Sequence, residues 1–492
     1  MNKKEKIIVI GISILLGMFM CSWFLNGFYS MDTQRINSQG YFNYAINDAY
    51  IKDGRIFSAI IFALLGFTSL SIKTVYIINL IISILILSIS VLEIYKILNK
   101  IKPTDNKKRK ILYYLVSSLY IFNFTLTNIV QFIDSFVINM SVLLFIKSLE
   151  KSIIDKNRKE GFLYALIAIF CYQGTVPVYI ATAFLLCLLI YKKVDKKFLK
   201  DFIISMFIMA LVGILNVLFV AIVPHFFGLE LTSRVSLSTL ITKVRQNFYD
   251  FYNVIFDCYG HFPKYLLLAF GFCILIIIGI YGIKEKKINH VVYILSILLA
   301  YMFSIFIMFP IEAQKGIVRI LVPVGELFSA LYMYLLCNTD IFEKNQFYKK
   351  ALIFILAVYF IINTCNTFKI TKEYKMANII DQEFVRKVEN KIEEEYGKDV
   401  DEVNFTVFYR NYENMNYDMN TFDKSLYLNG SCTTYMLKFY MKEKYNLNRQ
   451  IYDENIILEN FGQKSSKQLE MKNIDGVLYI VVDFSNNNIL EM

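Results

Sequence analysis

Residues 74–98 decide the fold class of this chain, and they read TVYIINLIISILILSISVLEIYKIL. This apolar run is long enough to cross a bilayer as one helix. Similar windows lie near residues 7–25, 111–129, 201–223, 264–283, 288–309, 318–337 and 350–367, with shorter candidates at 132–147, 160–172 and 174–191. The sequence therefore predicts an α-helical polytopic membrane protein with about eleven transmembrane helices.

The composition excludes an ordinary soluble domain. The 492 residues are 56% hydrophobic and 19% charged, and the aromatic residues include 35 Tyr and 43 Phe, as expected for interfacial belts. The net charge of +11 comes from short Lys/Arg runs between apolar windows, so nucleic acid is not an expected partner. The eight Cys show no CxxC spacing, which argues against a zinc site or a disulfide framework.

Basic clusters set the expected orientation. They occupy residues 3–6, 100–110, 147–159, 192–200, 284–287 and 344–350, all in loops that the positive-inside rule assigns to the cytoplasm. The N-terminus is then cytoplasmic, while the loops 26–73 and 224–263 and the C-terminal portion lie outside. A crossing by the apolar segment 56–70 would move the cluster at 100–110 outside. We therefore predict that this segment is re-entrant or interfacial.

Two domains are expected, a membrane domain over 1–367 and a small extracytoplasmic α/β domain over 368–492. Within the first, the pairs 111–147 and 160–191 are predicted to form tight hairpins. In the second, Ile380, Phe384, Val388 and Ile392 mark an amphipathic helix, and Val403–Tyr409 and Gly476–Asp483 have the patterns of strands.

Acidic and basic side chains follow the first apolar window closely. Asp32 and Arg35 lie within ten residues of its end, near the expected headgroup plane. An Asp there can take a proton from an acceptor hydroxyl, and an Arg can bind a lipid-linked phosphate through two hydrogen bonds. A solvated surface ion pair is the alternative interpretation of these two residues.

A second acidic and basic group, Asp53-Gly54-Arg55, opens the interfacial segment. Gly54 permits a tight turn, and Arg55 is a candidate phosphate ligand. The alternative role of Asp53 is to cap the helix that follows.

Further candidates lie at the expected outer turns. Asp134 follows Gln131 in an apolar setting, where a carboxylate needs either an Arg partner or a substrate. Tyr172 and Gln173 can hydrogen-bond sugar hydroxyls, although Gln173 can equally be a satisfied interhelical amide. Arg319 can bind a polyprenyl phosphate or reach a lipid headgroup as a membrane-anchoring side chain.

The chain resembles the bacterial glucosyl transferase GtrII family, which are integral membrane glycosyltransferases of the GT-C type. The resemblance rests on Ser30-Met-Asp32 with Arg35, on Asp53-Gly54-Arg55, and on the turns Gln131–Asp134 and Cys171-Tyr-Gln173, followed by Arg319–Pro323. It covers roughly residues 1–365. Family members often carry an Asp-Asp pair in the first loop, whereas Met31 precedes Asp32 here.

The resemblance implies a GT-C-like fold and a hexosyltransferase of the bacterial cytoplasmic membrane. Glucose or another hexose would pass from a polyprenyl-phosphate donor to a cell-envelope polysaccharide or glycolipid on the outer face. Asp32 would be the general base. Donor phosphate would bind Arg35, Arg55 and Arg319, while the orienting residues would be Asp53, Asp134, Tyr172 and Gln173.

No cofactor is expected, since the chain lacks both a Gly-rich phosphate loop and a metal-ligand cluster. A divalent ion at the donor phosphate is possible but not indicated. The strongest rival function is a lipid-linked polysaccharide polymerase or flippase, which would use Arg residues in a central cavity. A solute transporter is a second rival, and it would place ionisable groups near the middle of its helices.

Overall fold

In a computed structural model, the chain forms two compact units, Met1–Gly27 with Tyr41–Thr371 and Phe28–Gly40 with Lys372–Met492. The described residues are 3–125, 129–226, 264–284, 288–306, 322–344, 346–397, 402–410, 446–449, 453–462 and 469–483, with a few isolated positions between them. The division into a membrane domain over 1–367 and an extracytoplasmic α/β domain over 368–492 stays a prediction.

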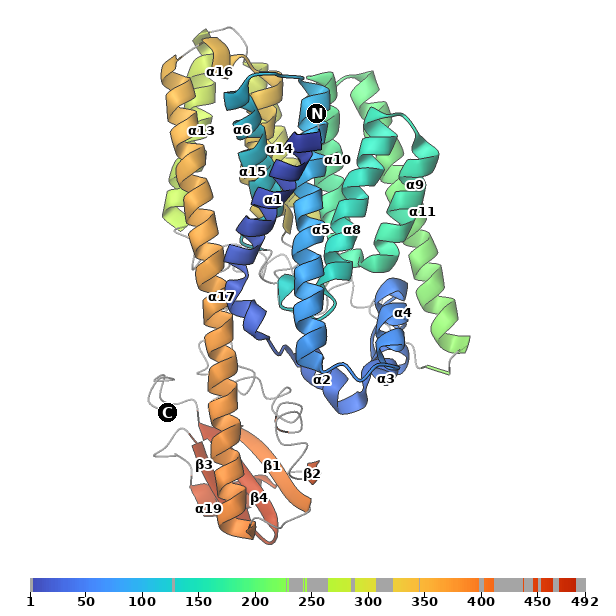
Figure 1. The fold of residues 1–492 in the computed structure, drawn as a ribbon, viewed down its shortest axis with the longest axis vertical. Helices are drawn as coiled ribbons and strands as arrows, with labels where there is room; N and C mark the ends of the chain where they lie inside the picture. The colour runs from blue at the N-terminus through green and yellow to red at the C-terminus, as the bar shows by residue number, and fades with distance from the viewer. Residues whose placement is uncertain are drawn as a thin grey trace. The chain divides into compact units, whose positions relative to one another are not determined.

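The first unit is a helical bundle (Figure 1). Its longer helices are α1 (Lys3–Met20), α4 (Ile56–Leu65), α5 (Ile72–Ile101), α6 (Lys107–Ile121), α8 (Ser135–Leu149), α9 (Arg158–Cys171), α10 (Val176–Tyr191), α11 (Lys196–Phe226), α13 (Lys264–Lys284), α14 (Asn289–Phe306), α15 (Val322–Asn338) and the first part of α17 (Gln346–Tyr396). Short elements are η1 (Ser22–Asn26), α3 (Tyr41–Asn43), η2 (Tyr44–Asp48), η3 (Glu150–Ile154), η4 (Gln173–Thr175) and α16 (Ile341–Lys344).

In the described parts, five helices are long and apolar enough to cross a membrane. They are Ile72–Ile101, Gln173–Tyr191, Lys196–Phe226, Asn289–Phe306 and Gln346–Tyr396. The chain is thus a mostly helical, multi-pass membrane protein. The total of about eleven spans stays a prediction, because other helices such as α6 and α8 have only 15 residues. Helix α4, with ten residues, is too short to cross.

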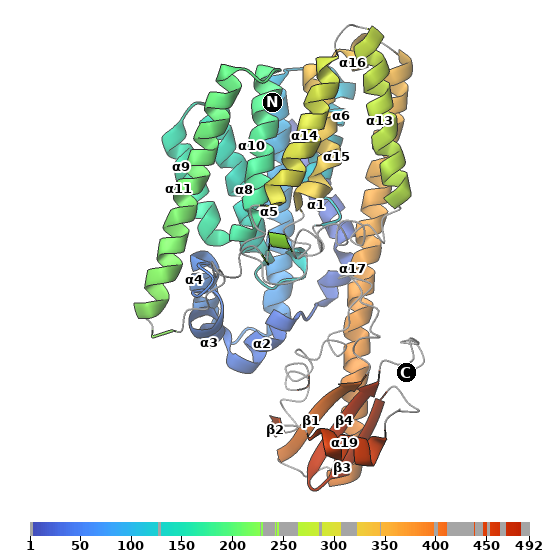
Figure 2. The ribbon, with the colours of Figure 1, turned by 180° about the vertical axis from the view of Figure 1, so that it is seen from behind.

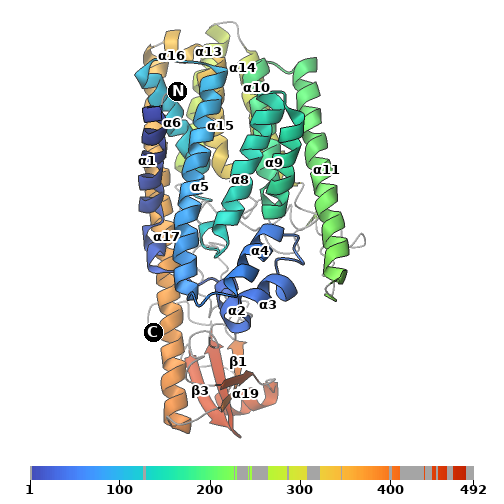
Figure 3. The same cartoon turned by 45° about the vertical axis from the view of Figure 1, so that its right-hand side comes forward.

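Helix α5 lies at the centre of one side of the bundle, between α1 and α8 (Figure 3). Helix α8 packs against both α5 and α9, whereas α10 packs mainly against α14, α15 and α11 (Figure 2). The turn between α9 and α10 is short, as the predicted 160–191 hairpin requires. Its two arms nevertheless bury their apolar faces chiefly against other helices, since each helix of this apolar sequence has several equally apolar neighbours.

A buried hydroxyl group ties three helices of the bundle together. The Tyr120 hydroxyl of α6 lies 2.7 Å from Thr182 Oγ1 on α10 and 2.9 Å from the Tyr301 hydroxyl on α14. All three side chains are buried. In an apolar surrounding such bonds are required, because a polar atom without a partner loses its hydration and gains nothing.

The second unit combines α2 (Met31–Gln39), the C-terminal part of α17 and a small α/β fold. Its strands β1 (Glu402–Arg410), β2 (Asn446–Arg449), β3 (Leu469–Ile474) and β4 (Val477–Asp483) pair in the order β2-β1-β4-β3. Strand β1 is parallel to β2 and β4, while β3 is antiparallel to β4.

Helix α19 (Glu454–Phe461) covers this sheet through Ile457 and Phe461, which pack on Tyr479 and Val481. The two strands predicted from the sequence are confirmed as β1 and β4. The amphipathic helix is confirmed as part of α17, where Phe384, Val388 and Ile392 are buried.

Replacing Tyr120 with Phe should lower the thermal unfolding midpoint of the purified protein in detergent. The change leaves the hydroxyls of Thr182 and Tyr301 without their shared partner, at a cost of about 1–3 kcal/mol. Tyr114→Phe on the same helix is the matched control, because its hydroxyl is buried without a hydrogen-bond partner in the described part of the chain. Equal midpoints for the two variants would contradict a stabilising role of the Tyr120 bonds.

Candidate functional site

Five of the predicted site residues meet in the first unit, and we call them the Arg55 cluster: Asp53, Arg55, Asp134, Tyr172 and Gln173. Arg55 is at its centre. Its Nη2 lies 3.4 Å from Asp53 Oδ2, and its Nη1 lies 3.7 Å from Asp134 Oδ2. The guanidinium carbon stands 4.8 Å above the centroid of the Tyr172 ring, which is a cation–π distance. Sequence positions more than a hundred residues apart therefore form one polar group.

The local backbone presents Arg55 toward its partners. Gln173 Nε2 donates to the Asp53 carbonyl oxygen at 2.7 Å and to Asn216 Oδ1 at 3.1 Å. Asn216 Nδ2 in turn donates to the Gly54 carbonyl oxygen at 3.2 Å. Gly54 has φ +72°, and a Cβ there would lie 2.6 Å from a Val220 methyl group. Only glycine suits both the left-handed backbone and the close approach of α11.

The Arg55 guanidinium stays charged. Burial alone would lower its pKa, but the charges of Asp53, Tyr172 and Asp134 outweigh this, so the pKa is raised above its ordinary value. Its Nε is buried and has no hydrogen-bond partner among the described residues. With both carboxylates ionised, the two Asp and one Arg carry a net charge of −1. The Arg55 Nε–H is thus a buried donor that the described residues leave unsatisfied.

These contacts bear on three of the alternatives that the sequence left open, while the substrate-orienting roles of these residues stay a prediction. Asp53 does not cap the following helix, because α4 begins at Ile56 with Arg55 at its N-cap. Asp134 has an Arg partner, Arg55. Gln173 is a bridging amide, joining the turn at 53–55 to α11.

Two residues of the site were not predicted from the sequence. Ser58 Oγ donates to Asp134 Oδ2 at 3.1 Å, and Asn216 holds the turn as described above. Asn216 could have been predicted, because a single amide in the apolar window 201–223 needs a buried partner. Ser58 lies one helical turn after Arg55, so it shares a face of α4 with it.

Asp32 and Arg35 lie in the second unit, on α2. The helix begins with a capping box, in which Ser30 Oγ accepts from the Thr33 backbone N–H. Asp32 lies in the first turn, where its negative charge interacts favourably with the helix dipole, and it is partly exposed. The structure thus assigns Asp32 and Arg35 to a different unit from the Arg55 cluster. Arg319 lies outside the described residues.

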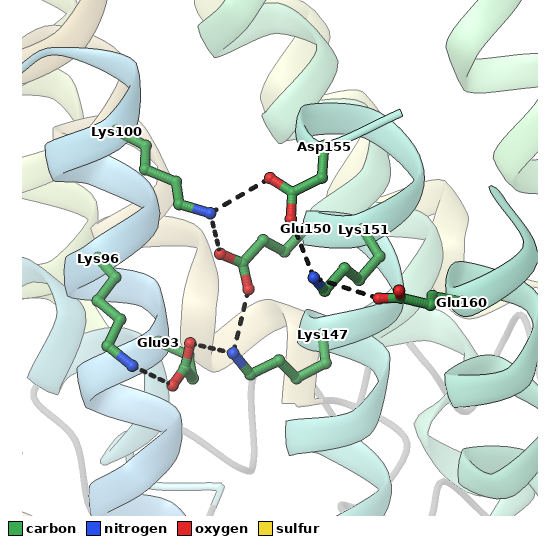
Figure 4. A network of polar contacts seen from close by, with 8 residues as sticks. All are labelled: Glu93, Lys96, Lys100, Lys147, Glu150, Lys151, Asp155 and Glu160. Atoms are coloured by element: carbon green, nitrogen blue, oxygen red, sulfur yellow. Dashed lines mark hydrogen bonds and ion pairs between the residues drawn. The ribbon is translucent and has the colours of Figure 1, made fainter. Parts of the chain in front are cut away.

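A second charged group occupies the other end of α8 and α9 (Figure 4). Four Lys and four carboxylates alternate in it: Glu93, Lys96, Lys100, Lys147, Glu150, Lys151, Asp155 and Glu160. We call it the lysine–carboxylate network. Asp134 precedes the first residue of α8 and Glu150 follows the last, so about 22 Å of helix separates the two clusters.

Comparison with known families identifies the chain. The family model described as Glucosyl transferase GtrII matches residues 21–336. The chain belongs to the GtrII glucosyl transferase family. It is therefore an enzyme of membrane glucosyl transfer, which favours transfer over the polymerase, flippase and transporter alternatives. No curated protein and no solved structure matches the chain.

The matched region of this glucosyl transferase contains the whole Arg55 cluster as well as Asp32, Arg35 and Arg319. The strands of the second unit lie beyond it. In the described residues, no group of three or more His, Cys, Asp or Glu side chains is placed to hold a metal ion.

Gly54→Ala should destabilise the glucosyl transferase by about 1–3 kcal/mol, since it adds both backbone strain and a clash with Val220. The measurement is the thermal unfolding midpoint in detergent. Gly40→Ala separates the two effects, because Gly40 has φ +84° but open space around its Cβ position. If Gly54→Ala lowered the unfolding midpoint no more than Gly40→Ala, the close contact between Gly54 and α11 would not contribute to the destabilisation.

Acid should weaken the lysine–carboxylate network. Burial raises the pKa of Glu150, but the Lys100 hydrogen bond and the Lys147 charge outweigh it, and the pKa lies below the ordinary 4.5. A carboxylate with a lowered folded-state pKa stabilises the protein above 4.5, and this stability is lost as pH falls through the lowered value.

The unfolding midpoint of the wild type should therefore fall in acid below pH 4.5, and Glu150→Gln should show a lower midpoint at neutral pH with a flatter acid dependence. The exposed Glu383→Gln is the control and should follow the wild type. Parallel curves for Glu150→Gln and the wild type would rule out this role of Glu150.

Proposed function

We propose that this glucosyl transferase moves glucose, or another hexose, from a polyprenyl-phosphate donor to a cell-envelope polysaccharide or glycolipid on the outer face of the bacterial cytoplasmic membrane. The observation that carries the proposal is the Arg55 cluster, in which a guanidinium lies between two carboxylates and has a buried Nε without a hydrogen-bond partner among the described residues. It lies at the end of the bundle opposite the lysine–carboxylate network. The positive-inside rule assigns the lysine-rich end to the cytoplasm and therefore the Arg55 cluster to the outside.

The reaction needs a base and a site for the leaving phosphate. The acceptor hydroxyl oxygen attacks the anomeric carbon of the donor sugar, and the bond from that carbon to the phosphate oxygen breaks. The hydroxyl proton passes to a carboxylate, and polyprenyl phosphate leaves with the bonding electron pair. Guanidinium groups stabilise the negative charge that develops on the leaving oxygen.

Asp32 is the proposed general base. It is partly exposed on the first turn of α2, so a sugar hydroxyl can reach it. Asp134 is less suited to this task, because it is 2% exposed, accepts a hydrogen bond from Ser58 and pairs with Arg55. A carboxylate stabilised in this way is a weaker base.

Arg55, Arg35 and Arg319 are the proposed phosphate ligands. Arg55 already neutralises one of its two carboxylate neighbours, so it cannot compensate a phosphate on its own. Additional guanidiniums are needed, and Arg35 and Arg319 are the candidates. Asp53, Asp134, Tyr172 and Gln173 then orient Arg55 and the sugar. The Tyr172 ring lies under the Arg55 guanidinium and so helps to fix its orientation.

The test is sugar transfer by purified variants, with a radiolabelled polyprenyl-phosphate glucose as donor and envelope glycan as acceptor. Asp32→Asn should lower turnover by about 10²–10⁴-fold, as expected for loss of a general base. Arg55→Lys keeps the charge but loses the fork-shaped donor, so it should weaken donor binding more than it lowers turnover.

Glu383→Gln, an exposed change in the same unit as Asp32, should retain full activity. Folding of each variant is checked by its unfolding midpoint. A folded Asp32→Asn enzyme with wild-type turnover would remove Asp32 from the mechanism, and unaltered donor binding by Arg55→Lys would do the same for Arg55.

A further inference from the structure

An open cavity of about 540 Å³ lies at the lysine-rich end of the first unit. Its walls come from the start of α1, the end of α5, the loop that follows and the start of α6. Its lining includes Lys6, Lys96, Asn99, Lys100, Asp105 and Lys110. Four lysines and one aspartate thus line the same cavity. The Arg55 cluster, at the far end of the bundle, has no part in it.

The ammonium groups of the cavity are mostly held in place by carboxylates outside its lining. Lys96 Nζ lies 2.7 Å from Glu93 Oε1, and Lys100 Nζ lies 2.6 Å from Glu150 Oε1. Glu93 and Glu150 are both 4% exposed. Lys110 Nζ lies 3.2 Å from Glu5 Oε1, so three of the four lysines are ion-paired with carboxylates outside the cavity lining.

Lys6 is different, because it has no carboxylate partner in the described part of the chain and is exposed on the first turns of α1. The segments 3–6 and 93–110 that surround the cavity carry ten basic and three acidic residues. The surplus of positive charge favours an anion with several oxygen atoms. Asn99 adds an amide that can donate to such oxygens.

The rim of the cavity indicates where the anion comes from. Ile7 follows Lys6 on α1 and is 61% exposed, and Ile111 follows Lys110 on α6 and is 58% exposed. Polar lining thus gives way to exposed apolar side chains within one residue on both helices. A ligand with a charged head and hydrocarbon chains matches this boundary, because the head can occupy the cavity while the chains cover Ile7 and Ile111.

We propose that this cavity binds the phosphate group of an anionic phospholipid. The phosphate oxygens lie among Lys6, Lys96, Lys100 and Lys110, and the acyl chains run along the exposed faces of α1 and α6. This second site is independent of the sugar-transfer reaction. It would fix the bundle to the leaflet at its lysine-rich end.

Binding is measured with the purified full-length chain in detergent, by native mass spectrometry and by the thermal unfolding midpoint. The probes are phosphatidylglycerol, phosphatidylcholine with the same acyl chains, and inorganic phosphate. Phosphatidylglycerol should bind best and raise the midpoint most. The double variant Lys6→Gln with Lys110→Gln should bind it about tenfold more weakly.

The matched control is Lys3→Gln with Lys107→Gln, which removes the same charge from the same two helices outside the cavity lining. It should keep phosphatidylglycerol affinity within about twofold. The single variant Lys6→Gln breaks no ion pair with any described residue, so it should weaken binding without lowering the midpoint of the lipid-free protein.

Two results would overturn the proposal. Equal losses in the two double variants would show a diffuse charge effect without a defined site. Inorganic phosphate that raised the midpoint as much as phosphatidylglycerol at the same concentration would assign the cavity to a soluble phosphate ligand.

Discussion

A lipid environment cannot hydrogen-bond the polar groups of a membrane bundle, so each of them must find its partner inside the protein. The helices α8 and α9 show the result, with a charged cluster at each end and an apolar stretch between. The two clusters differ in their numbers of basic and acidic side chains. The lysine–carboxylate network has as many lysines as carboxylates, whereas the Arg55 cluster has two carboxylates, one guanidinium and a buried Nε without a partner in the described residues. The buried Nε is the feature that distinguishes the Arg55 cluster.

The apolar windows and the terminal strands could be predicted because they depend on local periodicity and length. The members of the Arg55 cluster could be named for the same kind of reason, since charged and amide side chains at the ends of apolar windows are costly without a role. Their arrangement could not be predicted. The Gln173 bond to the Asp53 carbonyl joins residues 120 apart, and the Asn216 bond to Gly54 joins residues 162 apart. Such pairs follow from helix packing, which the similar apolar faces of this sequence do not specify.

The position of the segment Phe28–Gly40 also could not be predicted from the local sequence. Its sequence adjoins the first window, which suggests a loop of the membrane domain, yet it belongs to the second unit. The Tyr29 backbone N–H donates to Asn378 Oδ1 at 2.8 Å, and Asn378 Nδ2 donates back to the Tyr29 carbonyl. Phe28 packs edge-on against Tyr374. The backbone of Tyr29, paired with a side chain 349 residues away, and the ring contact of Phe28 with Tyr374 fix this segment on α17, and no local sequence pattern predicts these contacts.

The same constraint distinguishes the surroundings of two carboxylates, Asp134 and Asp32. Asp134 is buried, receives a Ser58 hydrogen bond and faces a guanidinium, so its charge is used to hold Arg55 in place. A group that satisfies its neighbours in this way gives up the freedom to take a proton from a substrate. Asp32 keeps part of its surface open to solvent on a well-capped helix. Asp32 and Arg55 thus belong to different compact units, and of the two carboxylates Asp32 has the more exposed surface.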